Sequence, residues 1–247
     1  ARRQRQMCIR DSLSTEAGLR NGSIWANCMW LKGVVMKAHY NGLIPRNPFI
    51  QFHISPNVKE REYLTEDELK AVMTHEFADS KLAYIRDIFI FASFTVLSFV
   101  DIQELTNDNI VEVNGEKWIL SKRHKTKVAF QVKLLDIPLQ IVERYRPMQK
   151  DNRIFPDLNY WSICKPLKRM IRECGITKSI SFHCSRHGFA TLALSKGMPI
   201  ESVSRVLGHT NIVTTQLYAK ITTQKLDNDL TMFGDKLSKT FNGITMS

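Results

Sequence analysis

Apolar residues recur at three- and four-residue spacing along most of this chain, and that period predicts amphipathic helices. At one expected helix start, Thr65 and Glu68 fit a capping box. The helices that we expect cover residues 23–40, 65–77, 82–97, 101–105, 139–146, 160–173, 183–196, 200–207, 214–220 and 223–233. The chain is therefore predicted to be mainly helical.

Only one region alternates apolar and polar residues with the period of a β-strand. Residues 109–113 and 117–121 do so on either side of Asn114-Gly115, a dipeptide typical of a two-residue hairpin turn. A third strand fits residues 129–134. The predicted fold class is mainly α with a small antiparallel β-sheet.

A proline-rich stretch divides the chain. Residues 45–60 hold three prolines and show little periodicity, as is typical of a linker. We therefore expect two domains. Residues 1–58 form a helical region with its linker, and residues 59–247 form a larger domain.

The charge of the chain indicates a class of partner. Lys and Arg number 35 against 24 Asp and Glu, which gives a formal net charge of +11. Residues 1–55 alone hold eight Lys or Arg against two acidic residues. Such a basic excess is typical of proteins that bind nucleic acid, because Lys and Arg neutralise backbone phosphates.

Other features exclude several classes of protein. The five cysteines form no Cys-x-x-Cys pair, and no Cys/His spacing suits zinc. No apolar run reaches about 18 residues, so no membrane span is expected, and the basic N-terminus lacks the apolar run of a signal peptide. We expect a cytoplasmic protein with reduced thiols and with no metal or other cofactor.

Four residues near the C-terminus supply the parts of a phosphoryl-transfer site. His183 and Arg186 are three apart, so on a helix they project from one face. Arg186 offers a planar fork of N–H donors to phosphate oxygens, and His209 can add another donor. Tyr218 carries a phenol that can attack phosphorus and hold the product covalently. His187 would point about 100° away from Arg186 and is interpreted as a packing or surface residue.

The stretch from about Tyr63 to Lys220 resembles the catalytic domain of the tyrosine recombinases, the phage-type integrases. That family has His-x-x-Arg, a long gap, Leu-Gly-His, and a tyrosine nine residues after that histidine. The residues that match this order and spacing are His183, Arg186, His209 and Tyr218. The residues flanking the arginine, the second histidine and the tyrosine also agree with the family.

The resemblance implies a role for each of these positions. Tyr218 would attack the scissile phosphate and form a 3′-phosphotyrosyl link, releasing a 5′-hydroxyl. Arg186 and His209 would bind nonbridging oxygens, and His183 would assist proton transfer with the nucleophile. Rejoining would need no ATP, because the phosphotyrosine keeps the bond energy of the broken linkage.

Two further positions of the family pattern, a lysine and the first arginine, have no single clear match in this chain. The lysine that protonates the leaving oxygen falls within residues 121–127, where Lys125 is favoured and Lys122 is the alternative. The family's Thr-Gly-Leu-Arg pattern ends here in Ser98, so the first arginine is missing. We place Ser98 in the catalytic set in its stead, because a serine can hydrogen-bond a phosphate oxygen although it cannot supply the charge. This substitution resembles integrases of conjugative and mobilisable elements of Bacteroides-type bacteria. Arg123 is the candidate replacement, since it would leave the same strand face as Lys125; otherwise it is a DNA-backbone contact.

The resemblance implies a site-specific recombinase that integrates or excises a mobile element in the bacterial cytoplasm, at the nucleoid. Its partners would be double-stranded DNA at attachment sites, three further copies in a tetramer, and accessory DNA-bending or excision proteins, with no membrane. Two alternatives are a type IB topoisomerase and a DNA-binding relative that no longer cuts, which Ser98 favours. The text before Tyr63 resembles the last part of a core-binding domain, so we expect a fragment or short form.

Overall fold

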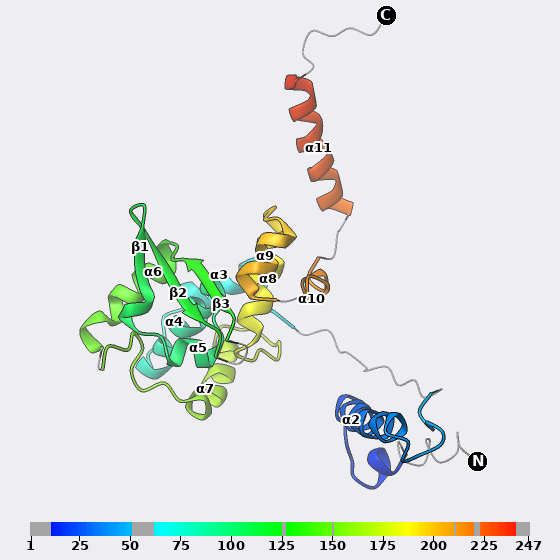
Figure 1. Ribbon diagram of the computed structural model, residues 1–247. Coiled ribbons are helices and arrows are strands. Elements are labelled where there is room, and N and C mark those ends of the chain that lie inside the picture. The colour runs from blue at the N-terminus through cyan, green and yellow to red at the C-terminus, as the bar shows by residue number, and fades with distance from the viewer. Residues whose placement is uncertain are drawn as a thin grey trace, which may run out of the picture. The chain divides into compact units, whose positions relative to one another are not determined.

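The computed structural model describes residues 11–50, 62–124, 127–149, 151–209, 211–219 and 223–240. The chain divides into two units, Ala1–Glu60 and Arg61–Ser247. The first unit, blue in Figure 1, contains a helical segment at residues 11–15 and the helix α2, Asn21–Tyr40. Ile24 and Cys28, four residues apart, are buried on one face of α2.

The second unit is helical with one small sheet, so the predicted fold class is confirmed (Figure 1). Its helices are α3 (Glu66–Thr74), α4 (Ser80–Thr95), α5 (Phe99–Gln103), α6 (Asp136–Tyr145), α7 (Tyr160–Glu173), α8 (Cys184–Ser195), α9 (Ile200–Leu207), α10 (Val213–Gln216) and α11 (Thr223–Thr240), with 3-10 turns η1 (Asn107–Asn109) and η2 (Arg146–Met148). Its strands are β1 (Ile110–Val113), β2 (Glu116–Lys122) and β3 (Ala129–Lys133). Within the described ranges, no helix is long and apolar enough to cross a bilayer.

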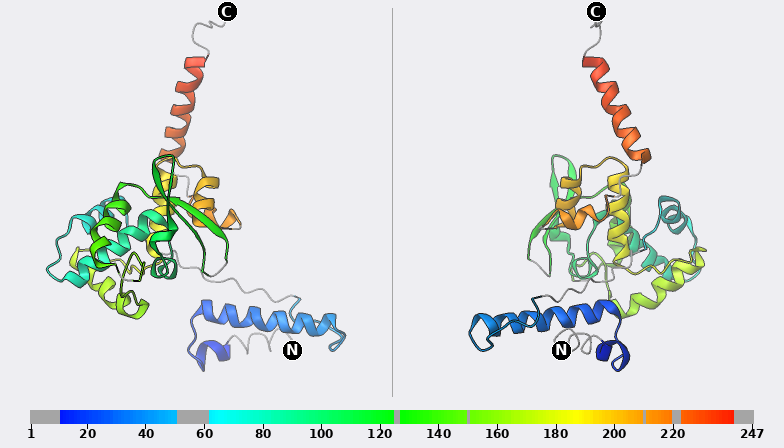
Figure 2. Two further views of the ribbon diagram at one scale, coloured as in Figure 1. Left: turned by 60° about the vertical axis from the view of Figure 1, so that its left-hand side comes forward. Right: turned by 90° about the vertical axis from the view of Figure 1, so that its right-hand side faces the viewer.

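The sheet is a meander in which β2 pairs antiparallel with both neighbours. Asn114 and Gly115 have φ values of 53° and 78°, and positive φ at both central positions is the requirement of a type I′ hairpin turn. Ile119 lies opposite Val132, and both are buried. One face of the sheet therefore packs on the helices, as Figure 2 shows.

Local signals fix the helix starts. The Thr65 hydroxyl accepts a hydrogen bond from the amide of Glu68, and the Glu68 carboxylate accepts one from the amide of Thr65, so the predicted capping box is confirmed.

α4 packs against α6, α7 and α8. Because α4 is covered on several sides, most of its residues are buried and it has no single apolar stripe.

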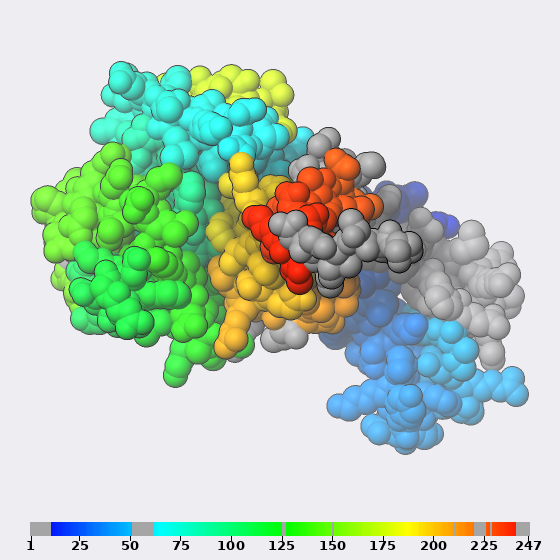
Figure 3. All heavy atoms as spheres, turned by 90° about the horizontal axis from the view of Figure 1, so that it is seen from above, coloured from blue at the N-terminus to red at the C-terminus, as the bar shows by residue number. Residues whose placement is uncertain are grey.

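Two apolar clusters hold the second unit together. The larger cluster surrounds α4 and includes Phe89, Phe91 and Phe155. The smaller cluster joins α8 and α9 to the end of α4, and Tyr218 packs at its edge. In the space-filling view, α8 and α9 (yellow to gold) lie beside the green residues of the sheet (Figure 3). The smaller cluster therefore supports the region where the predicted site residues lie.

Candidate active site

The residues predicted to form the site come from three short stretches of the second unit. His183 is the N-cap residue of α8, and Arg186 lies in its first turn. His209 follows the end of α9, and Tyr218 follows α10. Lys125 lies outside the described residues. The interactions of the other four side chains show how these stretches come together.

Arg186 links the ends of two helices. Its guanidinium donates to the backbone oxygen of Val96 at 3.2 Å and to that of Leu207. Burial lowers the pKa of Arg186 to about 10, and the charge of Arg123 adds to this, while Tyr218 acts in the opposite direction. The group stays cationic at neutral pH. Its electrostatic interaction with Tyr218 places it near the phenol.

His209 is held by a buried hydroxyl. Its Nδ1 lies 2.8 Å from Oγ1 of Thr215, and Thr215 is fully buried. Burial lowers the pKa of His209, and the nearby charges of Arg186, Arg123 and His183 lower it further. The ring is thus neutral near pH 7. When Thr215 donates to Nδ1, the proton is on Nε2, which can then donate to a phosphate oxygen.

Three aromatic rings, ending at Tyr218, form a row. The His183 and His187 ring centroids are 4.9 Å apart in an edge-to-face arrangement. The His187 and Tyr218 centroids are 5.1 Å apart with the planes at 51°. His187 is only 9% exposed, so it is a packing residue, and the ring that it packs on belongs to Tyr218, the predicted nucleophile. The sequence reasoning missed this contact, although the i, i+4 spacing of His183 and His187 indicated that they share a face.

Comparisons with known proteins identify the family of the chain. A sequence profile of the phage integrase family matches residues 62–225. The chain belongs to the phage integrase family. It is 32% identical over 177 residues to tyrosine recombinase XerA of Pyrococcus horikoshii, covering 66% of this chain and 58% of that protein. It is 25% identical over 229 residues to XerC of Lactobacillus leichmannii, covering 87% of this chain and 77% of that protein.

A solved structure extends the comparison to the fold. The Tn1549 transposon integrase in complex with circular intermediate DNA has a TM-score of 0.71 at 18% identity, covering 88% of this chain and 81% of that chain. At this identity the likeness establishes the fold alone. The chain spans 58% of the length of XerA from Pyrococcus horikoshii.

This member of the phage integrase family has a serine where the family's first arginine belongs, and the serine caps a helix. Ser98 is the N-cap of α5, and its hydroxyl donates to Oδ2 of Asp101 at 2.8 Å. The capping starts α5 at Phe99, two residues before the predicted start. Burial alone would raise the pKa of Asp101, but hydrogen bonds from the His124 amide, Ser98 and Arg123 and the charge of Arg123 hold it below the ordinary value.

Arg123 enters the site from the turn between β2 and β3. Its guanidinium donates to Asp101 at 2.9 Å and to the backbone oxygens of Val96 at 3.2 Å and Val206 at 3.1 Å. It also stacks over Phe130 at 4.2 Å. The prediction that Arg123 leaves a strand face was wrong, because β2 ends at Lys122. The side chain instead points into the protein and is 6% exposed.

The Val96 carbonyl accepts hydrogen bonds from both arginines. It can do so because Val96 ends α4 in the left-handed conformation, with φ 61° and ψ 16°. A β-branched residue adopts this region rarely and with strain, and the family pattern has glycine here. The sequence reasoning missed this position. Strained backbone of this kind gathers at functional sites.

Two neighbours of Arg123 lie nearer the surface. Lys122 is exposed at the end of β2. The His124 amide donates to Oδ1 of Asp101 at 3.0 Å, and Nε2 of its ring lies 3.3 Å from the carboxylate of Glu104. Among the described residues, no group of three or more His, Cys, Asp and Glu side chains is arranged to hold a metal ion.

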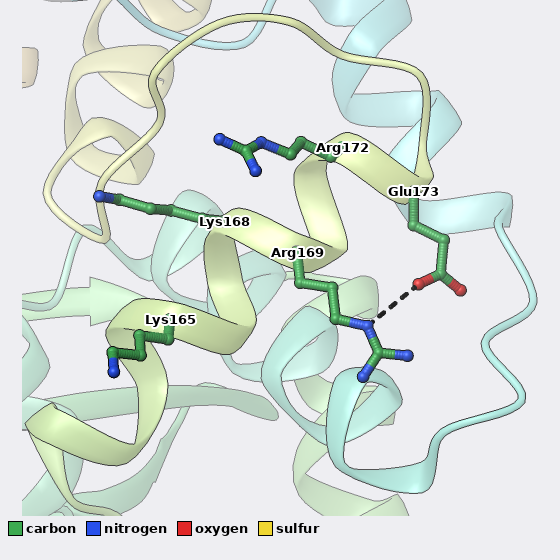
Figure 4. A pocket seen from close by; sticks show the side chains of 5 residues that line it. All are labelled: Lys165, Lys168, Arg169, Arg172 and Glu173. Carbon is green, nitrogen blue, oxygen red and sulfur yellow. Dashed lines mark ion pairs between the residues drawn. The ribbon is translucent and has the colours of Figure 1, made fainter.

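A basic surface lies on α7, whose start packs against α5 through the rings of Tyr160 and Phe99, 5.4 Å apart. Four of its exposed residues form a stripe at spacings of four, three and four, which places them on one helix face. We define this α7 stripe as Trp161, Lys165, Lys168 and Arg172. Arg169 beside it is paired with Asp79 and Glu173. Figure 4 shows the three cationic side chains of the stripe projecting from the helix.

Proposed function

We propose that this member of the phage integrase family is a site-specific DNA recombinase that cleaves and rejoins strands through a 3′-phosphotyrosyl intermediate at Tyr218. The observation that carries the proposal is the convergence of a phenol, two guanidinium groups and two imidazoles from separate elements. The electrostatic interactions of Arg186 with Tyr218 and Arg123, and of His209 with His183, support it. Family membership supports the same chemistry.

The proposed step conserves atoms and charge. The oxygen of Tyr218 attacks phosphorus, the bond from phosphorus to O5′ breaks, and the strand keeps its phosphate on the enzyme. The phenol proton goes to His183. The departing O5′ takes a proton from a lysine of the β2–β3 turn, with Lys125 as first candidate and Lys122 as alternative. Reversal by another 5′-hydroxyl rejoins DNA without ATP.

The charge that grows on the phosphoryl oxygens meets a preorganised set of donors. Arg186 and neutral His209 supply two of them. We propose that Arg123 supplies the cation that Ser98 cannot, because its guanidinium bonds to the same Val96 carbonyl as Arg186 does. Side chains thus provide the positive charge that many phosphoryl-transfer enzymes take from metal ions.

Double-stranded DNA at attachment sites is the proposed substrate. The net charge of +11 and the α7 stripe support it, since exposed cations next to α5 can neutralise phosphates on either side of the scissile one. We assign residues 1–58 to the end of a DNA-binding core domain and 59–247 to the catalytic domain. The biological role proposed is integration or excision of a mobile element of the Bacteroides conjugative type by a tetramer with accessory proteins.

A suicide DNA substrate tests the cleavage step. It carries a nick close to the scissile phosphate, so the freed 5′ end diffuses away and the covalent complex accumulates. We expect an adduct with the wild-type chain and none with Tyr218→Phe, with equal noncovalent binding. Binding without an adduct in the wild type would favour the non-cutting relative. Relaxation of supercoiled DNA by a monomer, without strand exchange, would favour the topoisomerase.

A matched pair of variants tests Arg123. Arg123→Ala should lower the rate of adduct formation by about 10²-fold or more, the effect typical of losing one donor to transition-state charge. Lys133→Ala changes a cation at the far end of β3 that is paired with Glu116 at 2.8 Å, and it should have little effect. If the two variants lose the same small amount of cleavage rate, Arg123 does not belong to the catalytic set and is a DNA-backbone contact.

A further inference from the structure

We infer that His187 is a positioning residue for the nucleophile: its ring fixes the Tyr218 phenol in the orientation for attack. The inference rests on the proposed function at Tyr218 and goes beyond it, since the resemblance assigns no role to His187 and the proposed chemistry does not use it. Its ring lies in the middle of the row, 4.9 Å from that of His183 and 5.1 Å from that of Tyr218.

The elements that carry these rings differ in rigidity. His187 is buried on α8, a twelve-residue helix that packs against α4 and α9. Tyr218 follows α10, which has only four residues. A single short turn gives its neighbours little cooperative support. The tyrosine therefore depends on side-chain contacts for its orientation, and His187 connects it to a well-packed helix.

Two histidines one turn apart have different environments. His183 is exposed, so DNA and solvent can reach it, whereas His187 is buried against the phenol ring. The packing of the His187 ring can hold Tyr218 at a fixed angle without proton transfer by either ring nitrogen. A phenylalanine at position 187 therefore separates the two roles, because it keeps a ring for packing but has no nitrogen that could transfer a proton.

Single-turnover adduct formation on the suicide substrate is the first test. His187→Ala should slow the reaction by about 100-fold, the effect that a misplacement of about 1 Å can have, with DNA binding unchanged. His187→Phe should keep most of the wild-type rate. The control is His75→Ala, the same change at a ring that contacts Phe77 at 4.5 Å instead, and it should react like the wild type.

A second substrate separates the nucleophile from the leaving group. When sulfur replaces the bridging O5′, the departing thiolate needs no proton donor. The slow reaction of His187→Ala should persist on this substrate, because the substitution affects the attacking phenol and not the leaving group. Recovery of the wild-type rate there, or failure of His187→Phe to restore cleavage of ordinary DNA, would overturn the inference.

A third measurement needs no cleavage. The chain has six tyrosines, and 3-fluorotyrosine gives each a ¹⁹F resonance, with Tyr218 assigned by its loss in Tyr218→Phe. His187→Ala should move that resonance toward the position of free fluorotyrosine, while the other five report that the fold is intact. An unmoved Tyr218 resonance would refute the ring contact. Absence of an adduct in the wild type would instead refute the proposed function, so the two failures are distinguishable.

Discussion

The guanidinium groups of Arg123 and Arg186 share one acceptor, the carbonyl of Val96. Two like charges so close repel each other, and that repulsion contributes to the lowered pKa of Arg186. Asp101 offsets it by accepting from Arg123 at 2.9 Å. The fold therefore holds these two cations in place, which is the preorganisation that the proposed cleavage step would need.

Asp101 should be essential to this arrangement. Asp101→Asn leaves the buried guanidinium of Arg123 without its anion, and breaking a buried pair in this way costs about 3–5 kcal/mol. We expect a lower urea midpoint and slower adduct formation. Glu104→Gln is the control, since Glu104 is exposed and faces only the ring of His124; it should change neither. Wild-type stability in Asp101→Asn would show that Arg123 has another partner.

His209 should make stability depend on pH. Its folded-state pKa is lowered below the ordinary value of 6.5, so the unfolded chain binds the proton more readily. The unfolding free energy of the wild type should then decrease as the pH falls through about 6.5 and level off below the folded-state pKa. His209→Gln cannot titrate and should lack this decrease in urea denaturation series from pH 8 to 5. Parallel curves for the two proteins would contradict the assignment.

At the residue scale, motif spacing was enough to select Tyr218, Arg186 and the two histidines, because each is identified by its order in the chain. It could not supply contacts between residues far apart in sequence. Arg123 reaches Val206, and nothing local indicates that pairing. Val96 was missed for a different reason: its left-handed backbone opposes the preference of a β-branched residue, so local propensity predicts the opposite.

At the scale of elements, the end of α9 controls the space beside Arg123. Gly208 ends that helix with φ 65°, and a Cβ there would lie 3.4 Å from Nε of Arg123. Gly208→Ala should cost about 1–2 kcal/mol from the left-handed backbone. The new methyl group would reach Arg123 at the short end of ordinary van der Waals distance, so we expect only a small additional decrease in the rate of adduct formation.

Gly197 provides the control for that prediction. It follows α8 with φ 89°, and no atom lies within 4 Å of the position of a Cβ. Gly197→Ala should therefore lose a similar amount of stability, measured by urea denaturation, while the adduct rate at saturating DNA stays at the wild-type value. Equal rates for the two variants would mean that Gly208 matters only as a turn residue.

The elements themselves were largely predictable. α7 and α9 have the predicted bounds because each has one apolar stripe and clear ends. The start of α5 was misplaced because Ser98 was read as a missing arginine and not as a helix cap. The end of β2 was predicted near residue 121, close to the observed end at Lys122. The position of Arg123 could not be predicted in the same way, because it depends on a turn closed by a hydrogen bond from the amide of Arg123 to the backbone oxygen of Val128 at 2.8 Å. Such turns follow from tertiary contacts, which strand alternation does not encode.

At the scale of the whole molecule, the α7 stripe should account for part of the salt dependence of DNA binding. Replacing Lys165, Lys168 and Arg172 by Ala should lower the slope of log K against log salt by up to about 0.9 for each phosphate that the stripe no longer neutralises. The control has the same charge change at Lys70, Lys117 and Arg146, which are already paired with carboxylates. Titrations of labelled duplex from low to high salt measure both slopes. If the two triple variants have the same slope, the net charge of the chain, and not the position of the α7 cations, sets the salt dependence, and α7 does not lie on the duplex.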